Sequence, residues 1–208
     1  MQKALVVDDH PFIRSTVKML LKQEGFEVVA ETDNGIDAVQ LAREHQPELI
    51  LLDIAMPRMD GLEVLGRITA LGLTSKVLVL TSQEPIYYSA RCMKAGAAGY
   101  ISKVDELSEL TKGIKAVMSG YMYFPNLAAS SVRHSDIEVS EQTMIQSLSD
   151  RELIILQQLA LGMSNKTIGE NLLLSSKTIS TYKTRLIEKL NMKSVVYLAE
   201  FAKRNNLV

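Results

Sequence analysis

Polar residues able to bind a metal ion or a phosphoryl group stand at the ends of four short apolar runs. The first run ends in Asp8 and Asp9, the third in Asp53, the fourth in Thr81 and the fifth in Lys103. Three carboxylates close together repel one another and favour a hard divalent cation, which we expect to be Mg²⁺. The cation and the lysine ammonium would form a cradle for a phosphoryl group, with one carboxylate as its nucleophile.

The elements that must bring these residues together are five strands alternating with amphipathic helices. This order predicts an α/β fold, a doubly wound five-stranded parallel sheet with helices on both faces. Right-handed crossovers place all strand carboxyl ends along one edge, where open α/β sheets bind their ligands. The predicted strands are Ala4–Val7, Val28–Ala30, Leu49–Leu52, Val77–Leu80 and Gly99–Ile101.

Asp53 is the best candidate for the nucleophile, because its strand is central and a turn over residues 56–61 follows it. A single aspartate after a strand is usually a turn or capping residue, and we interpret Asp33, Asp37 and Asp60 in that way. Chemically active residues at the ends of four of the five predicted strands are more than such local roles explain.

Composition excludes several other classes of protein. The single cysteine, Cys92, allows no intramolecular disulfide and no cysteine-based zinc site. The three histidines, His10, His45 and His134, do not have metal-ligand spacing. The first apolar run is too short for a signal peptide, and no run is long enough to span a membrane. We therefore expect a cytoplasmic protein.

The second half of the chain differs in character. Residues 125–147 are mostly polar and predict a linker with a short helix near Glu141–Gln146. Ser149 and Glu152 fit a capping box at the start of an all-α segment. The next two helices are separated only by residues 173–175, which suits a helix-turn-helix. The predicted helices are Asp150–Leu161, Asn165–Leu172, Ser176–Leu190 and Val195–Arg204.

The helix predicted at 176–190 has one apolar face, formed by Ile179, Leu186 and Leu190. Its opposite face carries Lys177, Ser180, Thr181 and Thr184, and its flanks carry Lys183, Arg185 and Lys189. Short hydroxyl side chains can touch base edges while cations bind phosphate. Charge supports this interpretation, because residues 148–208 hold nine Lys and Arg against five Asp and Glu, although the whole chain has a net charge of −1.

The motifs of the first 120 residues resemble the receiver domain of two-component response regulators. The resemblance rests on residues 7–10, 52–57, 60–61, 80–82 and 101–103. It implies the strand order 2-1-3-4-5 and assigns Asp53 as the phosphoacceptor. It also implies Mg²⁺ held by Asp8, Asp9, Asp53 and the Ala55 carbonyl, with Thr81 and Lys103 on the phosphoryl oxygens. Tyr100 would be the switch aromatic, which turns inward when Thr81 moves.

Residues 148–208 resemble the LuxR-type helix-turn-helix, a four-helix DNA-binding domain. A receiver followed by this module is typical of the NarL/FixJ class, and residues 177–186 are most similar to the BvgA/EvgA subgroup. The resemblance places Ser180, Thr181 and Thr184 on base edges. It implies phosphate contacts for Lys166, Lys177, Thr178 and Lys183. Gly169 stands where the family usually has alanine, and we expect it to loosen its helix by up to about 1 kcal/mol.

Together these resemblances imply a response regulator with a receiver at 1–122, a linker at 123–147 and a DNA-binding domain at 148–208. A sensor histidine kinase or its phosphotransfer domain would phosphorylate Asp53. The phosphorylated dimer would then bind double-stranded promoter DNA and regulate transcription, with RNA polymerase as a further candidate partner and no membrane involved. We do not expect the protein to be an enzyme in the ordinary sense. It would catalyse only its own Mg²⁺-dependent phosphorylation and slow dephosphorylation.

Three alternative functions differ from that of a DNA-binding response regulator. A phosphohydrolase of the haloacid dehalogenase type needs a second aspartate two residues after the nucleophile, where this chain has Ala55. An RNA-binding antiterminator is disfavoured by the helix-turn-helix pattern and the scarcity of aromatic residues for stacking. A purely protein-binding output is the third alternative.

Overall fold

Two units make up the chain, Met1–Asn126 and Leu127–Val208. The computed structural model describes residues 1–56, 61–125 and 136–208. The predicted turn residue Asp60 lies outside the described residues, as do positions 126–135 of the predicted linker.

The first unit is a five-stranded parallel sheet in the order β2-β1-β3-β4-β5, which confirms the predicted doubly wound fold. All five predicted strands are present. Most of them extend one or two residues beyond the predicted apolar run at one or both ends. The strands are β1 Gln2–Val7, β2 Phe26–Thr32, β3 Leu49–Leu52, β4 Lys76–Thr81 and β5 Gly99–Ser102.

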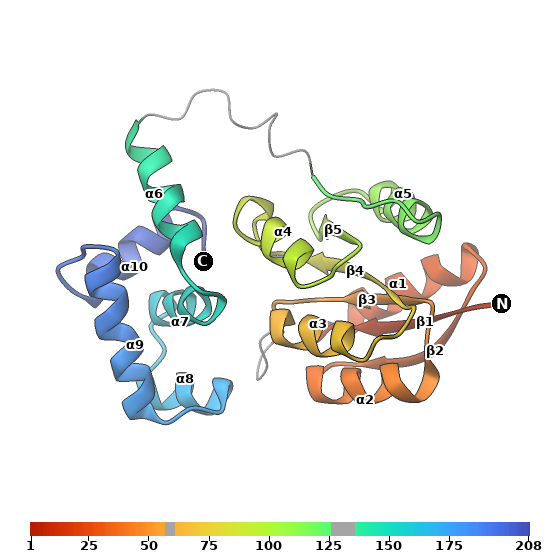
Figure 1. The fold of residues 1–208 in the computed structure, drawn as a ribbon, viewed down its shortest axis with the longest axis horizontal. Coiled ribbons are helices and arrows are strands. Elements are labelled where there is room, and N and C mark those ends of the chain that lie inside the picture. The colour runs from red at the N-terminus through yellow and green to blue at the C-terminus, as the bar shows by residue number, and fades with distance from the viewer. Residues whose placement is uncertain (57–60, 126–135) are drawn as a thin grey trace. The chain divides into compact units, whose positions relative to one another are not determined.

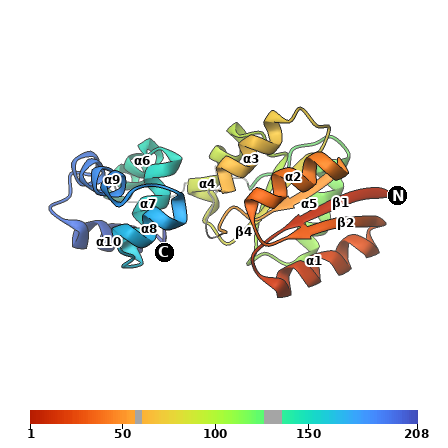
Figure 2. The same ribbon diagram turned by 90° about the horizontal axis from the view of Figure 1, so that it is seen from below.

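Helices cover both faces of this sheet. Helix α1 lies on one face and α2 and α3 lie on the other (Figures 1 and 2). Helix α5 shares the face of α1, because side chains of both helices join one apolar cluster, while α3 contacts both α2 and α4. The bounds are α1 Pro11–Gln23, α2 Gly35–His45, α3 Gly61–Ala70, α4 Pro85–Lys94 and α5 Leu107–Met118.

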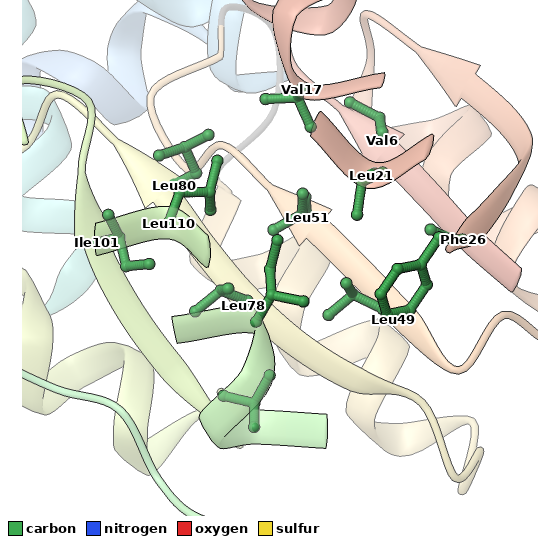
Figure 3. Close-up of a cluster of buried hydrophobic side chains, with 13 residues drawn as sticks. Val6, Val17, Leu21, Phe26, Leu49, Leu51, Leu78, Leu80, Ile101 and Leu110 are labelled. Atoms are coloured by element: carbon green, nitrogen blue, oxygen red, sulfur yellow. The ribbon is translucent and has the colours of Figure 1, made fainter. Parts of the chain in front are cut away.

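The cluster between the sheet, α1 and α5 follows from the two-residue period of the strands (Figure 3). Ala4 and Val6 of β1 belong to it, whereas Leu5 and Val7 point to the opposite face and are equally buried. Burying a leucine or valine side chain stabilises a fold by about 1.5–3 kcal/mol, so both faces anchor the strand register. The register in turn decides where the polar residues after each strand are placed.

Backbone hydrogen bonds extend the sheet just beyond its carboxyl edge. The Asp53 amide donates to the Val7 carbonyl at 2.8 Å, and the Lys103 amide donates to the Thr81 carbonyl at 2.8 Å. The Asp8 amide donates to the Thr32 carbonyl at 3.1 Å. These bonds pair the residue after β1 with β2, the residue after β3 with β1 and the residue after β5 with β4.

Gly61, at the start of α3, lies against the loop that carries Asp53. A Cβ atom added there would come within 2.2 Å of Ile54 Cα and 2.6 Å of the Ile54 carbonyl oxygen, both backbone atoms. We expect Gly61→Ala to lower the free energy of unfolding of this unit by about 2–4 kcal/mol, as measured by urea denaturation. Gly66→Ala in the same helix is the matched control.

A Cβ atom at Gly66 meets no atom within 4 Å. The control should therefore be neutral or stabilising by up to about 1 kcal/mol, because alanine favours the helix more than glycine does. Equal destabilisation by both substitutions would contradict the close approach at Gly61.

The second unit is entirely helical in its described residues and contains the four predicted helices. An additional helix, α6, precedes them and is longer than the short helix expected near Glu141–Gln146. Its Glu141 carboxylate accepts hydrogen bonds from Arg204 Nε at 3.1 Å and Asn205 Nδ2 at 2.7 Å, so α6 is attached to the last helix. The bounds are α6 Asp136–Ser147, α7 Asp150–Ala160, α8 Asn165–Leu172, α9 Ser176–Lys189 and α10 Val195–Arg204.

The predicted capping box at the start of α7 is present. Ser149 Oγ accepts from the Glu152 amide, and the Glu152 carboxylate accepts from the Ser149 amide. The same carboxylate lies 2.8 Å from Lys189 Nζ at the end of α9. Burial alone would raise the pKa of Glu152, but the contacts with Lys189 and Ser149 outweigh it and lower that pKa. Glu152 thus both caps α7 and joins it to α9.

Gly169 has a packing role that the sequence did not predict. A Cβ atom there would lie 2.5 Å from the Leu174 carbonyl oxygen in the turn between α8 and α9. The Leu174 amide also donates to the Gly169 carbonyl at 2.8 Å. In this structure glycine therefore permits the turn to pack closely on α8, rather than only loosening that helix. None of the described helices is long and apolar enough to cross a bilayer.

Candidate functional site

Side chains from three strand ends meet at the carboxyl edge of the sheet. Lys103 Nζ lies 2.7 Å from Asp8 Oδ2 and 2.6 Å from Asp53 Oδ2. The lysine thus bridges residues that follow β1, β3 and β5, which are far apart in sequence. The structure brings these predicted residues together as their positions after parallel strands indicated.

The bridge is largely shielded from water, with Asp53 only 1% exposed. Burial raises the pKa of the Asp8 carboxyl, and hydrogen bonds from Lys103 and the His10 amide offset only part of that effect. Burial also disfavours the Lys103 ammonium, but Asp53 and Asp8 together outweigh it and raise the pKa of Lys103. Lys103 therefore remains a cation beside the carboxylates across the physiological pH range.

The two oxygens of Asp53 have different surroundings. Oδ1 accepts a hydrogen bond from the Ala55 amide at 2.8 Å, while Oδ2 faces Lys103. This orients the carboxylate within the site and places Ala55 directly beside it.

Thr81 and Tyr100 lie on β4 and β5 and are both buried. Thr81 Oγ1 accepts a long hydrogen bond of 3.4 Å from the Gln83 amide. The Tyr100 hydroxyl donates to the Gln83 carbonyl at 2.6 Å, so its ring lies inward, and burial raises the pKa of that hydroxyl. Both switch candidates therefore hold the same residue of the loop between β4 and α4.

The donor set at this edge fits a divalent cation. One potential ligand atom from each of Asp8, Asp9, His10 and Asp53 lies within 4.8 Å of the others. Asp9 Oδ1 is buried and accepts no hydrogen bond from any described residue. A buried carboxylate oxygen without a donor is costly unless a cation balances it, and Mg²⁺ prefers such oxygen ligands.

In the second unit, α9 presents the predicted polar face to solvent. Lys177, Ser180, Thr181 and Thr184 are exposed, whereas Ile179, Leu186 and Leu190 are buried. The Thr181 and Thr184 hydroxyls donate to the carbonyls of Lys177 and Ser180, each at 3.2 Å. Both hydroxyl oxygens can still accept hydrogen bonds from outside the helix.

The other candidates for DNA contact differ in their exposure and in their contacts within the domain. Lys183 is half-buried, and exposed Lys166 lies 4.0 Å from Glu170. Thr178 lies in the first turn of α9, where its amide donates to the Ser175 hydroxyl at 3.0 Å. Lys189, which the sequence placed on a flank of this face, is paired with Glu152.

Comparison with known families covers both units. Residues 4–115 match the response regulator receiver domain, and residues 146–202 match the bacterial regulatory proteins of the luxR family. The chain belongs to the response regulators. Its receiver domain carries the acidic site, and its luxR-type DNA-binding domain carries α9.

Similar proteins extend over the full length of this response regulator. It is 53% identical to the transcription regulator BvgA of Bordetella pertussis, over 99% of this chain and 98% of that protein. It is 32% identical to the DNA-binding transcriptional activator EvgA of Escherichia coli K12, over 98% of each. These matches confirm the resemblance to the BvgA/EvgA subgroup.

The fold is also that of a solved response regulator. RcsB of Salmonella typhimurium superposes with a TM-score of 0.77 at 21% identity, covering 98% of each chain. At that identity the likeness concerns the fold alone. It confirms a receiver-type sheet followed by a helical helix-turn-helix domain.

Sequence reasoning missed two features of this response regulator. His10 lacks metal-ligand spacing in the sequence, yet its Nδ1 lies 2.8 Å from Asp9 Oδ1. Its position next to Asp9 is the signal that points to this contact. The pairing of Lys189 with Glu152 spans 37 positions and has no local signal.

Proposed function

We propose that Asp53 accepts a phosphoryl group from the phosphohistidine of a sensor histidine kinase or its phosphotransfer domain. The observation that carries this proposal is Lys103 bridging Asp8 and Asp53 at 2.7 and 2.6 Å. An Asp53 carboxylate oxygen attacks phosphorus as the phosphorus–nitrogen bond breaks, and the imidazole leaves with the electron pair. Lys103 and Thr81 then contact the phosphoryl oxygens.

Asp8, Asp9, Asp53 and the Ala55 carbonyl are the groups proposed to hold Mg²⁺. When bound, Mg²⁺ would balance the negative charge of the carboxylates and the incoming phosphoryl group. The buried Asp9 Oδ1, which accepts no hydrogen bond from the described residues, supports this assignment. The same site would catalyse only the protein's own phosphorylation and slow dephosphorylation, because Ala55 supplies no general acid beside the nucleophile.

Phosphorylation adds a charge of about −1.5 to −2, which attracts Lys103 and Thr81. Thr81 and Tyr100 both hold Gln83, so movement of Thr81 is transmitted to the loop between β4 and α4. We infer that this rearrangement favours a homodimer, which aligns two α9 helices with half-sites about one helical turn apart.

In this proposal residues 1–122 form the receiver and residues 148–208 the promoter-binding domain, with α6 attached to the latter. Ser180, Thr181 and Thr184 would read base edges, and Lys166, Lys177, Thr178 and Lys183 would bind phosphates. The name of EvgA, a DNA-binding transcriptional activator, supports duplex DNA over RNA as the ligand. RNA polymerase would be a further partner at the promoter, and we propose that the protein acts in the cytoplasm.

Gel shifts with and without a small phosphodonor and Mg²⁺ test the proposal. We expect phosphorylation to increase affinity for a selected duplex about 5- to 150-fold, the usual range of coupling between two sites. Binding should weaken steeply between two salt concentrations, because bound phosphates release counterions. Absence of duplex binding even after phosphorylation would contradict the proposed output.

A further inference from the structure

His10 places an imidazole nitrogen among the carboxylates of the acidic site. Its Nδ1 lies 2.8 Å from Asp9 Oδ1 and 3.5 Å from Asp8 Oδ1. Two ligands that occupy neighbouring positions of an octahedron with metal–ligand distances of about 2.1 Å are about 3 Å apart. The three atoms are thus spaced like ligands of one ion.

The imidazole faces the Asp8 and Asp9 carboxylates and does not cap the helix that begins beside it. His10 is the N-cap residue of α1, but its side chain makes no capping hydrogen bond. Asn34, the N-cap residue of α2, accepts from the Ile36 and Asp37 amides in the usual way. The hydrogen bonds of His10 come from its backbone: its amide donates to Asp8 Oδ1 at 2.8 Å, and its carbonyl accepts from the Arg14 amide at 3.1 Å.

The contact between His10 and Asp9 does not have the geometry of a hydrogen bond. Asp9 Oδ1 accepts none from the described residues, although Nδ1 lies at hydrogen-bonding distance. If Nδ1 carries no proton, its electron pair faces that of the carboxylate oxygen, an arrangement that a shared cation stabilises.

We propose that His10 Nδ1 is an additional ligand of the acidic site and shifts its selectivity from Mg²⁺ toward Mn²⁺. Mg²⁺ strongly prefers oxygen donors, whereas transition-metal ions of the same charge gain more from an imidazole. The inference rests on the proposed metal site and adds a nitrogen donor to its carboxylates.

The opposite role for His10 is that of a counter-charge, in which a protonated imidazole offsets the carboxylates. The two roles predict opposite effects of removing His10 on the affinity for the cation. Removing a ligand weakens cation binding, whereas removing a positive counter-charge strengthens it.

The experiment uses the full-length protein loaded with Mn²⁺ at pH 8. Pulsed electron paramagnetic resonance should detect nitrogen coupled to the Mn²⁺ in the wild type and none in His10→Ala or His10→Gln. Titrations should show that His10→Ala weakens Mn²⁺ binding about tenfold and Mg²⁺ binding by less than about threefold. His45→Ala, which removes a histidine from the last turn of α2, should behave like the wild type.

The outcomes separate this inference from the proposed function. Mn²⁺ bound without nitrogen coupling, or bound more tightly by His10→Ala, overturns the role of His10 and leaves the carboxylate site intact. No binding of Mn²⁺ or Mg²⁺ by the wild type overturns both the metal site and its histidine ligand.

Discussion

The Asp53→Asn variant is expected to take up no phosphoryl group from a small phosphodonor in the presence of Mg²⁺. An amide is a far weaker nucleophile than a carboxylate, so uptake should slow by at least about a thousandfold. Asn is close in shape to Asp, and its oxygen can still accept from the Ala55 amide, while Lys103 keeps Asp8 as a partner. The fold should therefore persist, as checked by circular dichroism.

Phosphate-affinity gels measure this loss directly. Asp37→Asn is the matched control, because Asp37 is an exposed aspartate of the same unit that bonds to Asn34 Nδ2. We expect the control to be phosphorylated like the wild type. A phosphodonor should also fail to raise the DNA affinity of Asp53→Asn, so any remaining response would place the phosphoacceptor elsewhere.

The second large effect is expected from replacing both Lys177 and Lys183 on α9 with alanine. If both bind phosphates, the double variant should lose on the order of 100-fold in affinity for selected and random duplexes alike. The slope of log affinity against log salt should become shallower by about two for each protomer bound. Gel shifts over a range of salt concentrations measure both quantities.

Two further variants test whether the loss of affinity is specific to the phosphate contacts of α9. Lys203→Ala removes an exposed lysine from the last turn of α10 and should change neither affinity nor slope. Thr181→Ala together with Thr184→Ala should weaken only the selected duplex, by about 1–3 kcal/mol for each base that is no longer read. Loss of affinity in Lys203→Ala equal to that of the double lysine variant would contradict α9 as the DNA-facing helix.

Local pattern was sufficient to predict most elements of this protein. Short apolar runs mark all five strands, and the Ser149–Glu152 spacing marks the start of α7, because these signals act between neighbouring residues. Helix α6 is longer than its local pattern predicts, and the contacts of its Glu141 join it to Arg204 and Asn205, more than 60 positions away. Such contacts have no local pattern.

For the acidic site, the sequence by itself determined which groups are present and at which sheet edge they lie. Asp8, Asp53 and Lys103 follow parallel strands and Thr81 ends one, and parallel strands end at a common edge. Only the tertiary structure decided that Lys103 bridges two carboxylates and that Tyr100 lies inward on Gln83. Those contacts depend on strand register and side-chain direction, which the packing of helices on both faces determines.

The same division holds for α9. Helical periodicity determined its apolar and hydroxyl-bearing faces, because a period of 3.6 residues relates sequence to direction. Tertiary structure alone decided that Lys189 joins Glu152 and that the turn packs against Gly169. It likewise placed the His10 imidazole among the carboxylates, a contact to which only the position of His10 next to Asp9 points in the sequence. Sequence thus specified the chemical groups and their order, and packing specified which of them meet.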